Sequence, residues 1–144
     1  MRPAVTQLSS VVLIATALAA GGCGGGQPQP AAGDAVVRVT ERDFHISVQP
    51  AVVRAGEVDV VSTNAGPDMH ELLVARADGR LPMRRDGLTV NEEALAPRLV
   101  GELQGTAPSS RHILRLHLRP GRYVLFCNMA GHYLGGMQAQ LVVR

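Results

Sequence analysis

Three residues near the C-terminus have side chains that could bind one metal ion together. Cys127, His132 and Met137 follow one another with four residues between each pair. A strand-like run ends at Cys127, and the residues after it include several glycines, which let the chain reverse direction. The imidazole and the thioether could then reach the point where the strand delivers the thiol. The segment therefore predicts a metal site built largely from one loop.

The donor atoms indicate which metal such a site prefers. Thiolate and thioether are soft ligands that suit copper, and imidazole binds copper in either oxidation state. Two His and one Cys in a plane, with a weak axial Met, describe a blue copper electron-transfer site, so a second His is needed. We select His70, because a polar turn at residues 64–69 leads into an apolar strand at this residue. The other candidates fall within predicted strands and are not expected to bind metal: His45, His112 and His117.

With these residues identified, the sequence resembles the cupredoxin family of blue copper proteins, the plastocyanin-like and azurin-like electron carriers. Residues 64–74 and 121–143 carry the resemblance: an early His after a turn with Asn and Gly, then a strand ending in Cys, then His and Met in the closing loop. The Cys-x4-His-x4-Met spacing is similar to that of rusticyanin-type members. In plastocyanin and azurin the residue after the first His is commonly an Asn that ties the ligand loops together. Here it is Glu71, which is expected to alter the rigidity and redox potential of the site.

The resemblance implies a function and a role for each ligand. One type 1 copper ion would alternate between Cu(II) and Cu(I) in a nearly fixed cage. The protein would carry single electrons between redox partners such as cytochromes or copper oxidoreductases, and it would not be an enzyme. Cys127 would dominate the electronic coupling, His70 and His132 would complete the ligand plane, and Met137 would tune the potential. His132 is expected to lie near the surface and to act as the port for electrons.

Other functions stay open. The protein could store copper or deliver it to an oxidase during assembly, although such trafficking sites tend to use Met-rich and His-rich sets, and this chain has no Met-rich run. It could also be a metal-free sandwich used for adhesion, in which Cys127 packs as a small apolar residue and Met137 begins a core strand. Zinc is a poorer fit than copper, because zinc sites do not need a Met ligand.

Short runs of Val, Leu and Ile bounded by turn residues predict strands along most of the chain after residue 34. Seven or eight short strands without a long amphipathic helix predict an all-β fold, a Greek-key β-sandwich. Residues 76–110 contain several Pro residues and Asp-Gly pairs, which favour turns, so this region is predicted to be mostly loop, with one helical turn capped by Asn91. The predicted strands are 36–40, 44–48, 52–54, 58–63, 71–75, 111–119, 123–127 and 137–143.

The N-terminus predicts export. Arg2, an apolar run at residues 8–20 and small residues after it are typical of a signal peptide. The end of this segment resembles a bacterial lipoprotein cleavage box, in which Cys23 would carry lipid and anchor the chain to a membrane. Cleavage by the ordinary signal peptidase after residues 17–19 is the alternative. We expect a signal peptide at 1–22, a flexible Gly/Pro tether at 23–33 and a copper-binding domain at 34–144, on the periplasmic or extracytoplasmic face of a membrane.

Charge and cysteine content narrow the function further. All fourteen basic residues are Arg, they are spread along the chain, and twelve acidic residues leave a formal charge of only +2. Nucleic acid is therefore not an expected partner. If Cys23 carries lipid, Cys127 is the only thiol of the mature chain and cannot form an internal disulfide, so its presence needs another explanation.

Overall fold

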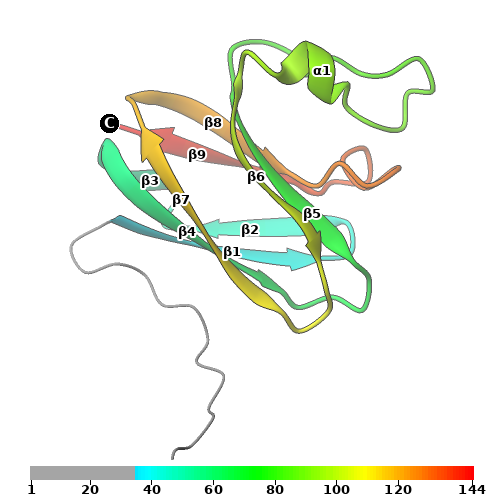
Figure 1. The fold of residues 1–144 in the computed structure, drawn as a ribbon, viewed down its shortest axis with the longest axis horizontal. Helices are drawn as coiled ribbons and strands as arrows, with labels where there is room; N and C mark the ends of the chain where they lie inside the picture. Colours follow the sequence, from blue (N-terminus) through cyan, green and yellow to red (C-terminus); the bar gives the residue numbers. More distant parts are fainter. Residues whose placement is uncertain (1–34) are drawn as a thin grey trace, which may run out of the picture.

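The computed structural model describes residues 35–144, which form two β-sheets packed face to face (Figure 1). The predicted signal peptide, the tether and Cys23 lie outside the described residues. The first sheet holds, in spatial order, β2 (His45–Gln49), β1 (Ala35–Arg42), β4 (Gly56–Asn64) and β7 (Arg111–Leu118). The second holds β3 (Val52–Val53), β9 (Gln138–Val143), β8 (Gly121–Phe126), β5 (His70–Arg76) and β6 (Leu99–Thr106).

The connections between strands pass repeatedly from one sheet to the other. The chain leaves the first sheet after β2, returns for β4, crosses again to β5 and β6, returns for β7 and ends in the second sheet. Most neighbours are antiparallel, whereas β1 pairs in parallel with β4 and β3 with β9. The predicted all-β sandwich is confirmed. The described residues contain nine strands, one more than the upper expectation of eight.

The main core lies between the two sheets and is aliphatic. Alternate residues of the strands point inward, as the period of two requires. Val37 and Val60 come from the first sheet, and Leu72, Leu125 and Leu141 from the second, and all five are fully buried. Cys127 and Met137 belong to the same buried cluster, so the predicted ligand loop begins and ends at the edge of the core.

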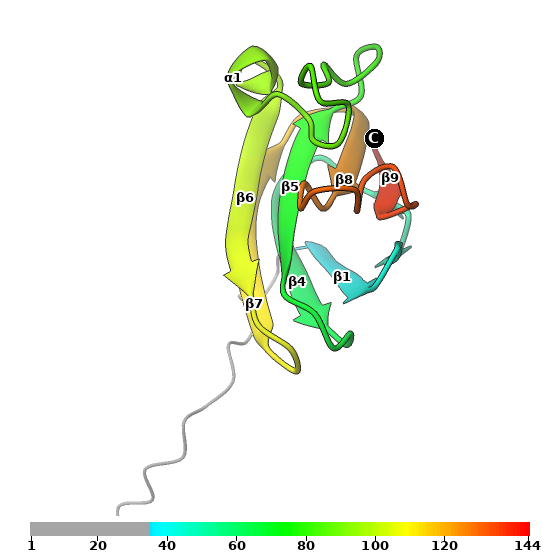
Figure 2. The same cartoon turned by 90° about the vertical axis from the view of Figure 1, so that its right-hand side faces the viewer.

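The additional strand is β6, in a region where the sequence predicts loop. Its pattern is weak because Gly101 and Gly105 occupy positions where a strand normally carries a side chain to pack. Gly101 is needed for space: a Cβ atom at this position would lie 2.5 Å from Cδ2 of Leu116 on β7. The glycine therefore lets β6 lie close against β7, as Figure 2 shows for these two strands.

A short helix, α1 (Glu92–Leu95), forms where the capped helical turn is predicted. The side chain of Asn91 accepts a hydrogen bond from the backbone N–H of Ala94 at 3.2 Å, which satisfies one of the helix's unpaired donors. Leu95 is fully buried in a second apolar cluster on the outer side of β5 and β8. Among the described residues no helix is long and apolar enough to cross a membrane.

One strand prediction is wrong at its first residue. Phe44 is predicted to share a strand face with Ile46 and Val48, but it lies in the turn between β1 and β2 and is 55% exposed. Since Arg42 pairs with His45, only two residues make this turn. Such tight hairpins need positive φ angles, and Phe44 has a φ of 60°.

Candidate metal centre

Three of the four predicted ligands meet in the structure. One side-chain ligand atom from each of His70, Cys127 and His132 lies within 4.8 Å of the others. Sγ of Cys127 is 3.5 Å from Nδ1 of His132, and the centroids of the two imidazole rings are 5.3 Å apart. His70 and Cys127 are fully buried and His132 is partly exposed. Such a group could hold a metal ion whose third donor reaches the surface.

The pairing of β5 with β8 brings the distant segments together. The two strands are antiparallel, with Leu73 opposite Phe126. The start of β5 therefore lies beside the end of β8. His70 is the first residue of β5, and Cys127 follows the last residue of β8. The register of the sheet thus determines which His faces the thiol.

The turn before His70 is held by Asn64. Its side-chain N–H₂ donates to the carbonyl oxygens of Asp68 at 2.7 Å and of Thr106 at 2.9 Å. Its side-chain oxygen accepts from the N–H of Gly66 at 2.9 Å, which forms a local turn. Because Asn64 is itself buried, the segment that presents His70 is fixed before any metal binds.

Backbone hydrogen bonds close the loop that carries the other ligands. The N–H of Cys127 donates to the carbonyl of Met137 at 3.1 Å, and the N–H of Met137 donates to the carbonyl of His132 at 3.0 Å. The loop continues with bonds from His132 to Met129 and from Gly135 to Gly131. The side chain of Met137 is fully buried. The backbone of Met137 therefore contacts both loop ligands, and the role of its thioether as a fourth ligand stays a prediction.

Burial shapes the protonation of the ligands. It raises the pKa of the Cys127 thiol, which backbone N–H groups of Glu71 and Met129 counteract by donating to the sulfur. It also lowers the pKa of His70, as does neighbouring His132, with Asp43 opposing them. The lowered pKa favours the neutral imidazole of His70, the form that binds metals.

The donor set fits a metal by a structural criterion as well. Among the described residues Nδ1 of His70 is buried without a hydrogen-bond partner, whereas Nε2 lies 3.3 Å from Oδ1 of Asp43. Leaving a buried polar atom such as Nδ1 unpaired costs about 1–3 kcal/mol. A metal bonded to Nδ1 would remove part of that cost. The buried thiol beside it adds a soft donor, so the chemistry of this set suits a soft or borderline cation.

Glu71, the residue expected to alter the rigidity of the site, links the two ligand segments. Its own N–H donates to the sulfur of Cys127, and its carboxylate accepts from the backbone N–H of Asn128. Burial raises the pKa of this carboxyl group, and the neighbouring Glu92 and Glu102 add to the effect. Glu71 therefore connects the segment of His70 to the segment of Cys127 and brings a titratable carboxyl group to that connection.

Asn128 is a structural residue that the sequence did not single out. Its side-chain oxygen accepts from the N–H of Val90 at 2.6 Å, and its side-chain N–H₂ donates to the carbonyl of Val90 at 3.1 Å and to Glu92 at 2.6 Å. These bonds attach the segment before α1 to the residue that follows Cys127. The long segment after β5 thus helps to hold the ligand loop.

The turn between β1 and β2 adds two further residues. Oδ1 of Asp43 lies 3.3 Å from Nε2 of His70. The ring of Phe44 meets that of His132 edge to face, with centroids 5.5 Å apart. Neither residue belongs to a ligand motif, and the only local signal was their position between two predicted strands.

The remaining His residues do not belong to this cluster of side chains. Nε2 of His112 is 3.1 Å from the hydroxyl of Ser110, and Nδ1 of His117 is 2.7 Å from Glu57. His45 is exposed at the start of β2. Each has a surface or sheet environment, and none joins the metal-binding group found among the described residues.

Apolar side chains are exposed around the centre. We call the following four residues the apolar rim. Phe44 contacts His132, Met69 precedes His70, and Met129 and Leu134 belong to the ligand loop. All four are exposed, Leu134 by 58%. Large apolar side chains exposed together are typical of a surface that contacts another protein.

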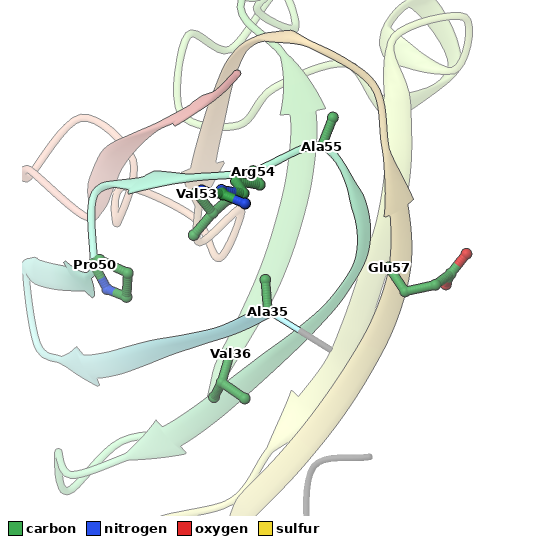
Figure 3. Close-up of a pocket in the computed structure, with 7 residues that line it drawn as sticks. All are labelled: Ala35, Val36, Pro50, Val53, Arg54, Ala55 and Glu57. Carbon is green, nitrogen blue, oxygen red and sulfur yellow. The ribbon is translucent and has the colours of Figure 1, made fainter. Parts of the chain in front are cut away.

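A surface pocket lies elsewhere, beside the start of β1 and the connection between β3 and β4 (Figure 3). Its lining includes Ala35, Val36, Pro50, Arg54 and Glu57. No Cys, His or Met lines it, so it offers none of the soft donors described above. The chemistry of the protein is therefore assigned to the ligand cluster rather than to this pocket.

Comparison with known proteins establishes the fold. No protein-family model and no curated protein sequence matches the chain. Dithionite-reduced auracyanin from Roseiflexus castenholzii is similar with a TM-score of 0.57 and 16% identity, over 77% of this chain and 98% of that one. Auracyanin A, a blue copper protein from Chloroflexus aurantiacus, gives 0.55 and 14%, over 78% and 100%. Rusticyanin from Thiobacillus ferrooxidans gives 0.56 and 17%, over 76% and 77%. The predicted cupredoxin-like fold is confirmed.

Proposed function

We propose that this chain, which has the fold of auracyanin and rusticyanin, is an exported blue copper protein that carries single electrons. His70, Cys127, His132 and Met137 would bind one type 1 copper ion. The observation that carries the proposal is the meeting of His70 with Cys127 and His132, within 4.8 Å, at the end of a sandwich of this fold. Burying an imidazole beside a thiol costs free energy that packing alone does not recover, whereas a bound metal would offset it.

The copper ion would supply a one-electron couple between Cu(II) and Cu(I). The protein residues would keep the ligands still while the charge changes. Asn64 fixes the segment before His70, and the bonds between Cys127, His132 and Met137 fix the loop. Two backbone N–H groups donate to the sulfur of Cys127 and stabilise negative charge there. Little movement would accompany each electron, which favours a carrier.

Electrons would enter and leave through His132. It is the most exposed of the three clustered donors, and Phe44 of the apolar rim packs against its ring. An apolar surface lets a partner approach closely after losing little hydration, which suits brief contacts with redox proteins such as cytochromes or copper oxidoreductases. The proposal includes no catalytic residue and no nucleic-acid partner.

The proposal extends to the location of the protein. Residues 1–22 would be removed as a signal peptide, Cys23 would carry lipid, and residues 23–33 would tether the copper domain at 34–144 to the outer or periplasmic face of a membrane. The sequence pattern alone supports this part. Metabolic labelling with a radioactive fatty acid tests it, since Cys23→Ser should remove the label and Cys127→Ser should not.

Adding copper to the purified protein tests the function. A Cys23→Ser chain without its signal peptide leaves Cys127 as the only thiol, because the sequence has two Cys. With Cu(II) we expect an intense blue thiolate-to-copper band and a reversible redox couple. The matched Cys127→Ser variant should bind copper weakly and stay colourless. A colourless or easily stripped complex of the Cys127 protein would favour copper storage or delivery, and no binding would rule out both functions.

A further inference from the structure

The two-residue turn between β1 and β2 contacts the outer side of both candidate imidazole ligands. Asp43 faces His70, and Phe44 faces His132. The turn is distant in sequence from both ligand motifs, yet Figure 1 shows it at the same end of the sandwich as the loop between β8 and β9. Asp43 and Phe44 are therefore placed to influence the orientation of both imidazole rings.

The carboxylate of Asp43 and the imidazole of His70 are a complementary hydrogen-bond acceptor and donor. Oδ1 of Asp43 and Nε2 of His70 are 3.3 Å apart, both atoms are buried, and neither has another hydrogen-bond partner among the described residues. A carboxylate accepts hydrogen bonds, and the protonated nitrogen of a neutral imidazole donates one. If Nε2 carries the proton, Nδ1 is left with a free lone pair. Nδ1 of His70 is likewise buried and without a partner in the described structure.

Gly66 provides the space that this approach needs. A Cβ atom at residue 66 would lie 2.8 Å from Oδ1 of Asp43 and 3.1 Å from Nε2 of His70. The N–H of Gly66 is held by the side chain of Asn64 at 2.9 Å. The glycine therefore lies against both members of the pair, and any side chain there would push them apart.

Phe44 fixes the turn over the centre. Its φ of 60° is rare for an aromatic residue, and such strain persists only where surrounding contacts enforce it. Here the ring packs against His132 and against Gly135, where a Cβ atom would collide with it. The carbonyl of Phe44 also lies against Gly136. The ligand loop and the turn are thus fitted to each other, which keeps Asp43 in place.

We propose that Asp43 is the positioning residue for His70: its carboxylate accepts a hydrogen bond from Nε2–H and so directs Nδ1 toward Cys127 and His132. This inference rests on the proposed copper site and adds a residue from outside the ligand motifs to it. A carboxylate behind a metal-bound imidazole fixes the tautomer and makes the imidazole a stronger donor. It also places negative charge near the metal, which favours Cu(II) over Cu(I).

Two substitutions at residue 43 and one matched control test the assignment. Asp43→Asn keeps a hydrogen-bond acceptor and removes the charge, whereas Asp43→Ala removes both. Asp68→Asn is the control, because Asp68 also acts on His70 electrostatically but is exposed and is not paired with its ring. The side chain at residue 43 is 31% exposed in a turn, so these changes should leave the core folded.

Three measurements read out the effect. In the metal-free protein, nitrogen NMR shifts should show His70 as the Nε2–H tautomer, and Asp43→Ala should give a mixture of tautomers. Copper affinity, measured by competition with a chelator, should fall by about 10- to 100-fold in Asp43→Ala and by less in Asp43→Asn. The reduction potential should become more positive in both. Asp68→Asn should stay close to the unsubstituted protein in all three.

The outcomes separate this inference from the function on which it rests. If the unsubstituted protein forms no blue complex, the proposed function fails, and the NMR measurement on metal-free protein still tests the contact with Asp43. If the blue complex forms but Asp43→Ala matches the unsubstituted protein in tautomer, affinity and potential, the role of Asp43 is overturned. Gly66→Ala gives an independent check, since pushing the pair apart should reproduce the Asp43→Ala result with Asp43 still present.

Discussion

The backbone N–H of Cys127 donates to the carbonyl oxygen of Met137 at 3.1 Å, although the two residues are ten positions apart in the chain. This bond continues the pairing of β8 with β9, whose last pair is Phe126 with Gln138. The two ends of the ligand loop are therefore joined as part of a sheet. The positions of the first and last ligands depend on the sandwich more than on the loop between them.

Replacing Met137 separates its role as a ligand from its role in packing. Met137→Leu keeps the apolar volume in the core, so the free energy of unfolding of the metal-free protein should fall by less than about 1.5 kcal/mol. If the thioether is the weak fourth ligand, the blue band should remain while the reduction potential becomes more positive, because a donor to Cu(II) is lost. Urea unfolding and voltammetry measure the two effects. An unchanged potential would remove Met137 from the ligand set.

A charge on the apolar rim should slow electron exchange. Met129→Glu or Leu134→Glu places a carboxylate that must be desolvated, or that repels its counterpart, when two molecules meet beside His132. We expect exchange between the oxidised and reduced protein, followed by NMR line broadening, to slow by about tenfold or more. Val100→Glu is the matched control, since Val100 is exposed near the other end of β6 from Thr106, the residue that pairs with His70. Equal rates in all variants would contradict His132 as the port.

Glu41 should make stability depend on pH. Burial raises its pKa above the ordinary value of 4.5, and hydrogen bonds from Ser62 and Thr106 only partly oppose this. The folded protein then keeps a proton that the unfolded chain releases, so the free energy of unfolding should decrease as the pH rises from 4.5 through the raised pKa. Glu41→Gln should flatten this decrease in urea unfolding of the metal-free protein. The exposed Glu93→Gln should not, and an equal slope in both variants would contradict a buried proton on Glu41.

An added methyl group should strain the contact between β6 and β7. Gly101→Ala places a Cβ atom 2.5 Å from Leu116, and overpacking of this kind costs about 1–3 kcal/mol. Thermal or urea unfolding should show that loss, while the visible spectrum of a copper complex should change little, because Gly101 lies far along β6 from Thr106. Gln104→Ala, exposed on the same strand, should be nearly neutral. Comparable stabilities would show that the side chain of Leu116 can move aside without cost and would contradict the prediction.

The sequence could predict the residues whose signals are local. Cys127 and His132, which meet in the structure, lie in one segment with glycines between them, and most strands show clear alternation. The choice of His70 rested on the turn before it and on the family resemblance. Strand β6 was not predicted, because glycine is uncommon within strands. The reason for Gly101 is its close contact with Leu116 of β7, which residues next to Gly101 in the sequence do not reveal.

The two residues of the β1–β2 turn could not be found from sequence for a related reason. Asp43 and Phe44 act on His70 and His132 through the way the sandwich folds over its end. Neither residue type is diagnostic of a metal site. Phe44 looked like one more apolar residue of a strand, and only the pairing of Arg42 with His45 shows that it must lie in the turn.

The complete burial of Cys127 makes its sulfur a reporter of motion in the metal-free protein. The thiol is free and inaccessible in the described structure, so an alkylating reagent can reach it only when the end of the sandwich opens for an instant. With Cys23 replaced, the rate of alkylation of Cys127 would measure how often that opening occurs. Comparing this rate among single variants of the surrounding segments would show which residues keep the end of the sandwich closed. The sulfur that would hold copper thus reports local unfolding without any added spectroscopic probe.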